Sequence, residues 1–423
     1  MSKWQWVLLQ ISRLLWVRAA IIGALGIGAA VLAALTEAYQ PGNLNFTIGA
    51  DAVDSLLSII ASSMLAVTTF SLSVMTSAFG AAANNVTPRA TKLLVQDRLT
   101  QNVLSTFLGS FLFSIVGLVV LKARAYGPEG RAVLFLFTIF VIALIVVSLL
   151  RWIDHLTRLG RVGETTDRVE QATRDAITQR LEKPFLGGCA RTEEKQHPES
   201  AIAIAAHSTG YVQNIDLVEL SACAKDVGAT VFLEVIPGAF VFLKAPLAWI
   251  DLPQEEGHKV ARAKLLEVAQ RAITIGEERN FDQDPRFGFC VLSEIASRAL
   301  SPAINDSGTA IDVIGRATRL LLLWSEGSVE VNEANPPYPD IHVPTLKIDD
   351  IFEDAFGTLA RDGAAQVEVQ LRLRKSLKAL SQVGGADFRN AAHRQAALAL
   401  KRAESALPLE EDTERLRAVS FER

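Results

Sequence analysis

Cysteine and histidine are scarce in this chain of 423 residues, which holds three cysteines and six histidines. Cys189, Cys223 and Cys290 form no CxxC pair, and no HxxxH or HExxH spacing accompanies them. Zinc sites in proteins depend on such closely spaced ligands. The sequence therefore offers no framework for a zinc site. We expect three buried, reduced thiols, no bound metal and no cofactor.

Familiar enzyme motifs are also missing. The sequence contains no GxxxxGK[ST] loop, no GxSxG elbow and no GxGxxG after an expected strand, and these motifs carry the common phosphate-binding and acyl-transfer chemistries. A basic stripe is absent as well, which argues against a nucleic-acid partner. We therefore predict no catalytic residues and a protein that is not an enzyme.

Charge is distributed unevenly along the chain. Residues 1–150 hold 9 Lys/Arg and 5 Asp/Glu, whereas residues 151–423 hold 33 and 41. Half of all residues are hydrophobic and the mean hydropathy is +0.26, which is high for a soluble protein. The composition thus indicates an apolar first third joined to an acidic part of ordinary soluble character.

Stretches long enough to cross a bilayer account for the apolar third. The expected spans are residues 15–36, 54–82, 103–121 and 132–150. The predicted fold is a membrane α-helical domain of four transmembrane helices followed by a cytosolic mixed α/β, mostly helical domain. The predicted domains are a transmembrane domain (1–150), a juxtamembrane helix (151–185) and a cytosolic α/β domain with a polar tail (186–423).

Lysine and arginine counts predict the orientation of the spans. Ten lie in the N-terminal flank, after the second span and after the fourth, against three in residues 122–131 and none in residues 37–53. Because cytoplasmic loops carry the excess of positive charge, both termini are expected in the cytoplasm. In the first span, Gly23 and Gly26 belong to a row of small residues that predicts close helix packing.

The second span carries one continuous small or hydroxylated stripe with acids at its outer end. The candidate pore-lining residues are Asp51, Asp54, Ser55, Ser58, Ser62, Thr69, Ser73 and Thr76. Two interpretations stay open. The stripe either packs tightly against another helix, with its hydroxyls bonded to its own backbone, or lines a water-filled path in a homo-oligomer. No ionisable residue lies mid-span, which argues against a proton-coupled pump.

Beyond the spans, a charged helix is expected to run without a break from Arg151 to about Leu181. Strands are expected at AIAIAA and TVFLEV, with a helix between them that Asp216 caps and that ends near Gly228. His155 is expected on an amphipathic face just under the membrane. Further helices are predicted at 254–278, 288–300, 308–325, 350–383 and 387–406, before a polar tail that frays.

One polar cluster stands out in the soluble part, the segment RALSPAINDSGTAID at 298–312. Its candidate ligand-binding residues are Ser301, Asn305, Asp306 and Thr309. Pro302 ends one helix, and Asp306 or Ser307 can cap the next, so a purely structural role is one interpretation. A site for an ion or small ligand at the free helix N-terminus is the other.

Several strings resemble a known family of predicted bacterial inner-membrane proteins that is described only as a domain of unknown function. They are the second span with its exit FSLSVMTSAFGAAANNVTPRATKLLV, then HSTGYVQNID, PGAFV, GEERNFDQDPRFGF and ALSPAINDSGTAI. The last is the most specific, although Ser307-Gly308-Thr309 stands where the family pattern usually has Pro-Phe-Thr. The resemblance implies a multi-span bacterial inner-membrane protein with a cytosolic domain, and it implies no activity.

Three functions follow from these features. The first is a homo-oligomeric ion channel or pore, lined by the second span and regulated by the cytosolic domain. The second is a non-enzymatic membrane sensor or scaffold whose cytosolic domain binds a ligand or partner. The third, a membrane-anchored enzyme, would centre on Glu294, Asn305 and Asp306. The expected partners are membrane lipid, further copies of the chain, and an inorganic ion or small ligand.

Overall fold

The computed structural model describes residues 3–12, 17, 20–28, 31, 50–95, 97–123, 128–191, 197–253, 259–327 and 336–421. The chain divides into two compact units. We call Val7–Thr165 the N-terminal unit and Thr166–Arg423, together with Met1–Trp6, the C-terminal unit. Helix α1 (Lys3–Ser12) lies across the first boundary.

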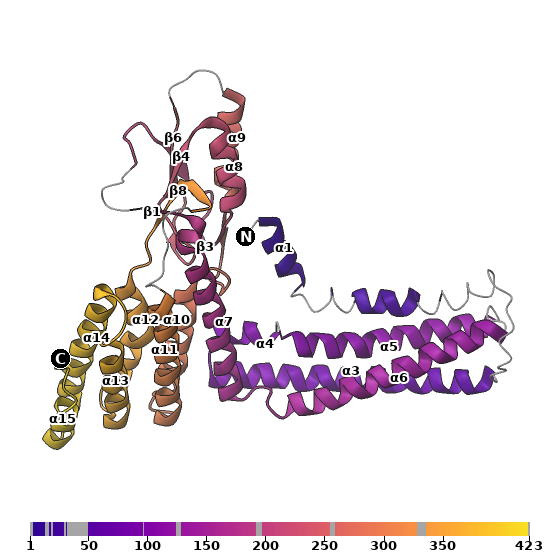
Figure 1. The fold of residues 1–423 in the computed structure, drawn as a ribbon. Coiled ribbons are helices and arrows are strands. Elements are labelled where there is room, and N and C mark those ends of the chain that lie inside the picture. The colour runs from indigo at the N-terminus through magenta and orange to yellow at the C-terminus, as the bar shows by residue number, and fades with distance from the viewer. Residues whose placement is uncertain are drawn as a thin grey trace. The chain divides into compact units, whose positions relative to one another are not determined.

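Long apolar helices build the N-terminal unit (Figure 1). They are α3 (Ala50–Asn85), α5 (Arg98–Lys122) and α6 (Pro128–Leu156), with the short α4 (Pro88–Val95) between the first two. Each long helix holds a stretch long and apolar enough to cross a membrane. These stretches contain the second, third and fourth predicted spans. Half of the first, 15–36, lies outside the described residues, and its described residues 17, 20–28 and 31 are helical.

Helix α5 is the centre of this unit, since it packs against both α3 and α6. It also meets the helical residues 20–28 at very short range: a Cβ on Gly109 would lie 2.6 Å from Ile22 Cγ2, and one on Gly26 would lie 3.0 Å from Gly109 O. Small residues allow this approach of two backbones. The close packing predicted for Gly23 and Gly26 is therefore confirmed, because a Cβ on Gly23 would lie 2.7 Å from Leu112.

The prediction of one unbroken helix from Arg151 to Leu181 is wrong. α6 ends at Leu156, and α7 (Val162–Glu182) begins after a turn. The carbonyl of His155 accepts from the backbone N–H groups of both Arg158 and Leu159, at 3.1 Å each, and Gly160 then adopts a left-handed φ of +81°. Glycine takes this conformation without steric cost, so the chain can leave the helix there.

The C-terminal unit contains two β-sheets, with strands from its first half and β8 from its second. The five-stranded sheet has the order β1-β8-β4-β6-β2, and the three-stranded sheet has the order β5-β3-β7. Pairing is parallel for β1 with β8 and β4 with β8, and antiparallel elsewhere. The strands are β1 (Gly188–Arg191, after the 3-10 turn η1, Pro184–Gly187), β2 (Ile202–Ala205), β3 (Gly210–Ile215), β4 (Thr230–Leu233), β5 (Phe240–Val241), β6 (Pro246–Asp251), β7 (Ile273–Gly276) and β8 (Tyr338–Pro344).

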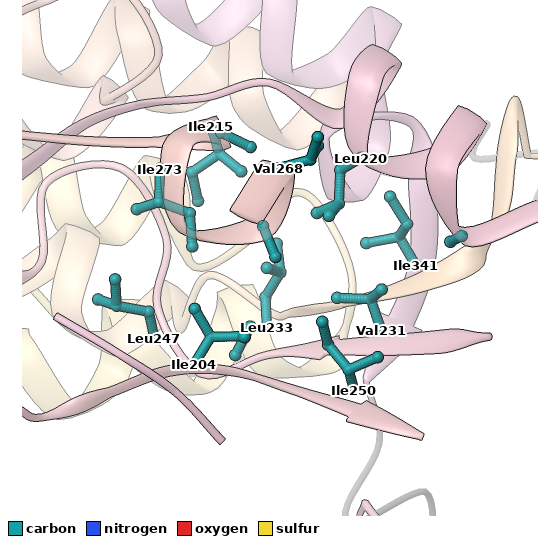
Figure 2. Close-up of a cluster of buried hydrophobic side chains, with 14 of the residues drawn as sticks. Ile204, Ile215, Leu220, Val231, Leu233, Leu247, Ile250, Val268, Ile273 and Ile341 are labelled. Atoms are coloured by element: carbon teal, nitrogen blue, oxygen red, sulfur yellow. The ribbon is translucent and has the colours of Figure 1, made fainter. Parts of the chain in front are cut away.

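Helices α8 (Leu217–Val227) and α9 (Lys259–Ala272) pack together beside these sheets and share one apolar core with them. Figure 2 shows Leu220 and Val268 of the helices among strand residues such as Val231. The predicted cap of α8 is confirmed, because Asp216 accepts from two backbone N–H groups and Gly228 closes the helix at a φ of +65°. Buried β-branched side chains on the strands fix which face turns inward.

The remaining helices form an array (Figure 1). They are α10 (Pro285–Ala299), α11 (Ser307–Gly327), α12 (Ile348–Asp362), α13 (Val367–Leu380), α14 (Ala386–Ala406) and α15 (Glu410–Arg417). Several of the closest pairs are not neighbours in sequence, namely α10 with α12, α12 with α14 and α11 with α13. α10, α11 and α14 confirm predicted helices.

Three predictions for the C-terminal unit need correction. The helix expected at 254–278 ends at Ala272, because Ile273–Gly276 pairs with β3 and buries Ile273 in the core. The helix expected at 350–383 is two helices, α12 and α13, separated at Gly363, where a Cβ would lie 2.9 Å from Val369. The tail contains α15, which buries Leu416 completely.

Candidate functional site

The polar stripe of α3 is exposed along its whole length. The exposed members are Asp51, Ser55, Ser58, Ser62, Thr69, Ser73 and Thr76, and Asp54 is half-buried. The opposite face of the same helix is buried, with Leu57, Ile60 and Met64 packed inward and Ser71 accepting a hydrogen bond from Trp152 Nε1 at 2.9 Å. Within the described part of the chain, α3 thus turns its apolar side to its neighbours and its polar side outward.

Hydroxyl groups on the stripe donate to the backbone of their own helix. Ser62 Oγ bonds to the carbonyl of Ser58 at 2.9 Å, and Thr76 Oγ1 to that of Leu72 at 2.9 Å. Thr69 Oγ1 bonds to two carbonyls one turn earlier, at 2.9 and 3.1 Å. A hydroxyl group has one hydrogen to donate and two lone pairs that can accept hydrogen bonds. At Ser62, Thr69 and Thr76 the outward surface of the stripe therefore presents hydrogen-bond acceptors.

Large apolar side chains border the stripe on both sides. At about 100° per residue, the stripe lies within about 40° of the direction of Ser62, except for Asp54 at about 80°. Exposed Ile59 and Phe70 lie about 60–80° to one side, and exposed Leu65 and Leu72 lie about as far to the other. A polar strip between two apolar edges is the arrangement expected of a helix whose edges contact neighbouring helices or lipid.

In the C-terminal unit, the segment 301–309 forms a tight helix-to-helix junction. Asp306 is the N-cap of α11: its Oδ1 accepts from Thr309 N at 3.0 Å and its Oδ2 accepts from Thr309 Oγ1 at 2.6 Å. Donation from the Thr309 hydroxyl, together with that backbone N–H, holds the pKa of Asp306 below its ordinary value. Asn305 has a left-handed φ of +50°, and its side-chain oxygen accepts a hydrogen bond from Gln366 Nε2 at 3.1 Å. Ser301 is half-buried, and its backbone carbonyl accepts from Asn305 N at 2.8 Å.

Further along α11, an ion network ties this helix to α7. Arg316 donates to Asp312 at 2.6 Å, to Asp167 at 2.5 Å and to buried Glu170 at 2.8 Å, and Arg319 donates to both oxygens of Glu170. Burial by itself would raise the pKa of Glu170, but the hydrogen bonds and charges of the two arginines lower it. The charges after the ALSPAIND string therefore hold two helices together.

His155 was expected on an amphipathic surface, and this prediction is wrong. The side chain is buried, its Nε2 lies 3.1 Å from Asp97 Oδ2 and 3.0 Å from Thr100 Oγ1, and its ring stacks on Trp152. Asp97 is also the N-cap of α5. Sequence reasoning missed this cluster because Asp97 and His155 are far apart in the chain. The cap pattern before α5 was the one local signal for it.

Three of the strings that carry the family resemblance meet at a second buried cluster. Asp284 is 2% exposed and accepts from Arg279 Nε at 2.8 Å, Arg279 Nη2 at 3.0 Å and the backbone N–H of Phe287 at 3.1 Å. Gly238 of the PGAFV turn lies against this carboxylate, and its N–H donates to Val212 O of β3 at 2.8 Å. The strings thus build one rigid junction between the sheets and α10.

The cysteines are free thiols, but the prediction that all three are buried is wrong, because Cys223 is buried whereas Cys189 and Cys290 are half-buried. Burial raises the pKa of Cys290 to about 12, so this thiol stays protonated at neutral pH. Among the residues that the structure describes, no group of three His, Cys, Asp or Glu side chains could hold a metal ion.

Comparison with known proteins identifies the family. A family model described as "Predicted membrane protein (DUF2254)" matches residues 12–379. The chain belongs to this family. The resemblance based on ALSPAIND and its companion strings is thereby confirmed, and the DUF2254 description agrees with the apolar helices of the N-terminal unit.

Curated relatives occur in mycobacteria. Uncharacterized protein Mb1321c of Mycobacterium bovis and uncharacterized protein Rv1290c of Mycobacterium tuberculosis are each 27% identical to this chain over 250 residues, which is 58% of this chain and 47% of theirs. The match thus spans about half the length of these relatives. No solved structure matches the chain.

Proposed function

We propose that this member of the DUF2254 family is a homo-oligomeric pore in a bacterial inner membrane, with α3 of each copy facing a polar path. Its termini lie in the cytoplasm, and the C-terminal unit regulates the path there. The observation that carries the proposal is the exposure of the α3 stripe beside a buried opposite face. One copy has too few membrane-spanning helices to enclose a path by itself. The path therefore requires several copies.

The chemistry of the stripe favours cations. The hydroxyl donors of Ser62, Thr69 and Thr76 are used inside the helix, so these residues turn oxygen lone pairs toward the path, and such lone pairs replace water around a cation. Asp51 and Asp54 near the start of α3 add negative charge at one mouth. The apolar edges at Ile59 and Leu65 suit contacts with neighbouring copies. A helix of 36 residues is about 54 Å long, so it extends beyond a hydrocarbon core of about 30 Å.

The alternative is a non-enzymatic scaffold in which the stripes of two copies pack directly against each other. Back-bonded hydroxyls are also compatible with tight helix packing. The C-terminal unit would then bind a ligand or partner, with the 301–309 junction as the first place to look. The two functions differ in whether water reaches the stripe.

Cysteine accessibility separates them. Single cysteines replace Ser58, Ser62, Thr69 or Ser73 in a chain whose three native cysteines are alanine, and the protein is reconstituted into liposomes. A charged, water-soluble thiol reagent should modify all four positions, which cover about 22 Å of helix. Phe70→Cys is the matched control, because it lies on an apolar edge, against lipid or a neighbouring copy, and should be protected from the charged reagent.

Ion flux from the same liposomes completes the test. Asp51→Asn should reduce cation flux, and Ser62→Leu should block it, because a bulky side chain then fills the stripe. Protection of all four cysteines from the charged reagent, together with no flux under any gradient, would overturn the pore. If the flux of both variants equalled that of the wild type, α3 would not line the path.

A further inference from the structure

An exposed apolar tip lies at the end of the three-stranded sheet. Phe240, Phe242 and Leu243, in and just after β5, are 48%, 67% and 57% exposed. Phe240 contacts the ring of Phe242 at 5.3 Å between centroids and that of Tyr211 at 4.9 Å. Single exposed apolar residues are common on protein surfaces, but a cluster of large ones marks an interaction site.

The backbone holds this tip in one conformation. Leu243 N donates to Thr209 Oγ1 at 3.0 Å, Lys244 N donates to Ala206 O at 2.9 Å, and Ala245 N donates to Phe242 O at 3.0 Å. A rigid tip keeps its apolar side chains in water when nothing covers them. It also loses little conformational freedom when it binds a partner, which favours binding.

Charge around the tip points to the occupant. Residues 201–215 and 235–250, which build β2, β3, β5 and most of β6, contain no Asp or Glu, although residues 151–423 hold 41. The charged residue of the tip is exposed Lys244, and exposed His207 follows Ala206, whose carbonyl accepts from Lys244 N. Glu277 and Glu278 follow β7, which lies on the other side of β3 from β5. The tip is therefore apolar with positive charge, inside an otherwise acidic unit.

We propose that Phe240, Phe242 and Leu243 insert into the surface of an anionic bilayer, with Lys244 at the level of the lipid headgroups. Aromatic and aliphatic side chains beside a lysine suit this boundary. The apolar helices of the same chain tether the C-terminal unit to a membrane, so the lipid surface is always present at high effective concentration. The proposal is independent of whether α3 lines a pore.

Fluorescence quenching in the full-length protein tests the insertion. The native cysteines are replaced by alanine, and Leu243→Cys carries an environment-sensitive fluorophore. The protein is reconstituted into vesicles containing phosphatidylglycerol, with or without brominated acyl chains. Leu398→Cys with the same label is the control, because Leu398 of α14 is also apolar, about half exposed and in the same unit.

If the tip inserts, the fluorescence emission of the label at position 243 should be blue-shifted and should be quenched by brominated lipid. The fluorescence of the label at position 398 should not be quenched. Phe242→Ser should reduce the quenching at 243. Lys244→Gln should shift the equilibrium between inserted and free tip roughly fivefold toward the free form in anionic vesicles. A water-exposed signal at 243 equal to that at 398 would overturn the proposal. A shielded label that brominated lipid does not quench would overturn it as well, because a protein surface would then cover the tip.

Discussion

Replacing Gly238 with alanine should damage the junction at Asp284. Gly238 has a φ of +94°, and an added Cβ would lie 2.2 Å from Asp284 Oδ2 and 2.5 Å from its Cγ. The carboxylate cannot rotate away cheaply, because both of its oxygens accept hydrogen bonds from Arg279 and one also accepts from Phe287 N. Arg279 is itself largely buried, with its side chain 19% exposed.

Gly228→Ala provides the matched control. Gly228 lies in the same unit with a φ of +65°, but the nearest atom to its added Cβ is Pro253 Cγ at 3.8 Å. A left-handed alanine costs about 1–2 kcal/mol, partly offset by the stiffer unfolded chain, so we expect a loss of about 1 kcal/mol. Gly238→Ala also disrupts a buried ion pair, and we expect it to lower the free energy of unfolding by about 4 kcal/mol in total.

Urea unfolding read by pulse proteolysis within residues 166–423 measures the difference. With a slope of about 3 kcal/mol/M, the Gly238→Ala midpoint should lie about 1 M below that of Gly228→Ala. Equal midpoints for the two variants would refute the reasoning, because both glycines would then contribute only their left-handed backbone. The double variant Gly238→Ala with Asp284→Asn is informative too. Its loss of unfolding free energy should be smaller than the sum of the losses in the two single variants, because both substitutions act on the same contact.

Two further predictions concern α11. Asp306→Ala should cost about 1 kcal/mol of the free energy of unfolding at pH 7, because the variant loses the N-cap. Since the pKa of Asp306 is lowered in the folded state, this stability is present above the unfolded pKa of about 3.9 and is lost as pH falls through the lower folded value. Urea midpoints at pH 7 and pH 3 measure it, and an equal deficit at both would contradict the capping account. Arg316→Leu should cost about 2–3 kcal/mol of the free energy of unfolding, because buried Glu170 then keeps hydrogen bonds from Arg319 only, with Arg174 Nη2 at 3.7 Å. The surface control Arg361→Leu should leave the urea midpoint almost unchanged, and an equal shift of the midpoint in the two variants would contradict the network.

Sequence alone determined the features that depend on local chemistry. Apolar runs long enough to cross a bilayer located α3, α5 and α6, because hydrophobicity over about 20 residues is a local property. Capping residues also act on their own helix ends, so Asp216 located the start of α8. The sequence left Asp306 and Ser307 open as caps of the next helix, and the structure decides for Asp306. The specific ALSPAIND string identified the family.

Other predictions failed where a distant segment decides the outcome. Ile273–Gly276 continues a helical pattern in the sequence, but pairing with β3 makes it a strand. Likewise, the single helix expected at 350–383 turns back at Gly363 because α13 packs against α11 and α14. Contacts with segments far along the chain override a weak local preference.

For the candidate sites, the sequence located the residues, and the tertiary structure decided their surroundings. The hydroxyl stripe of α3 was visible as a pattern, but only the packing of Leu57 and Ile60 against other helices shows that the stripe is the exposed side. His155 looks like a surface residue until Asp97 and Thr100 enclose it. The physical reason is that periodicity and capping act within a few residues, whereas burial depends on which distant segments come to lie against a side chain.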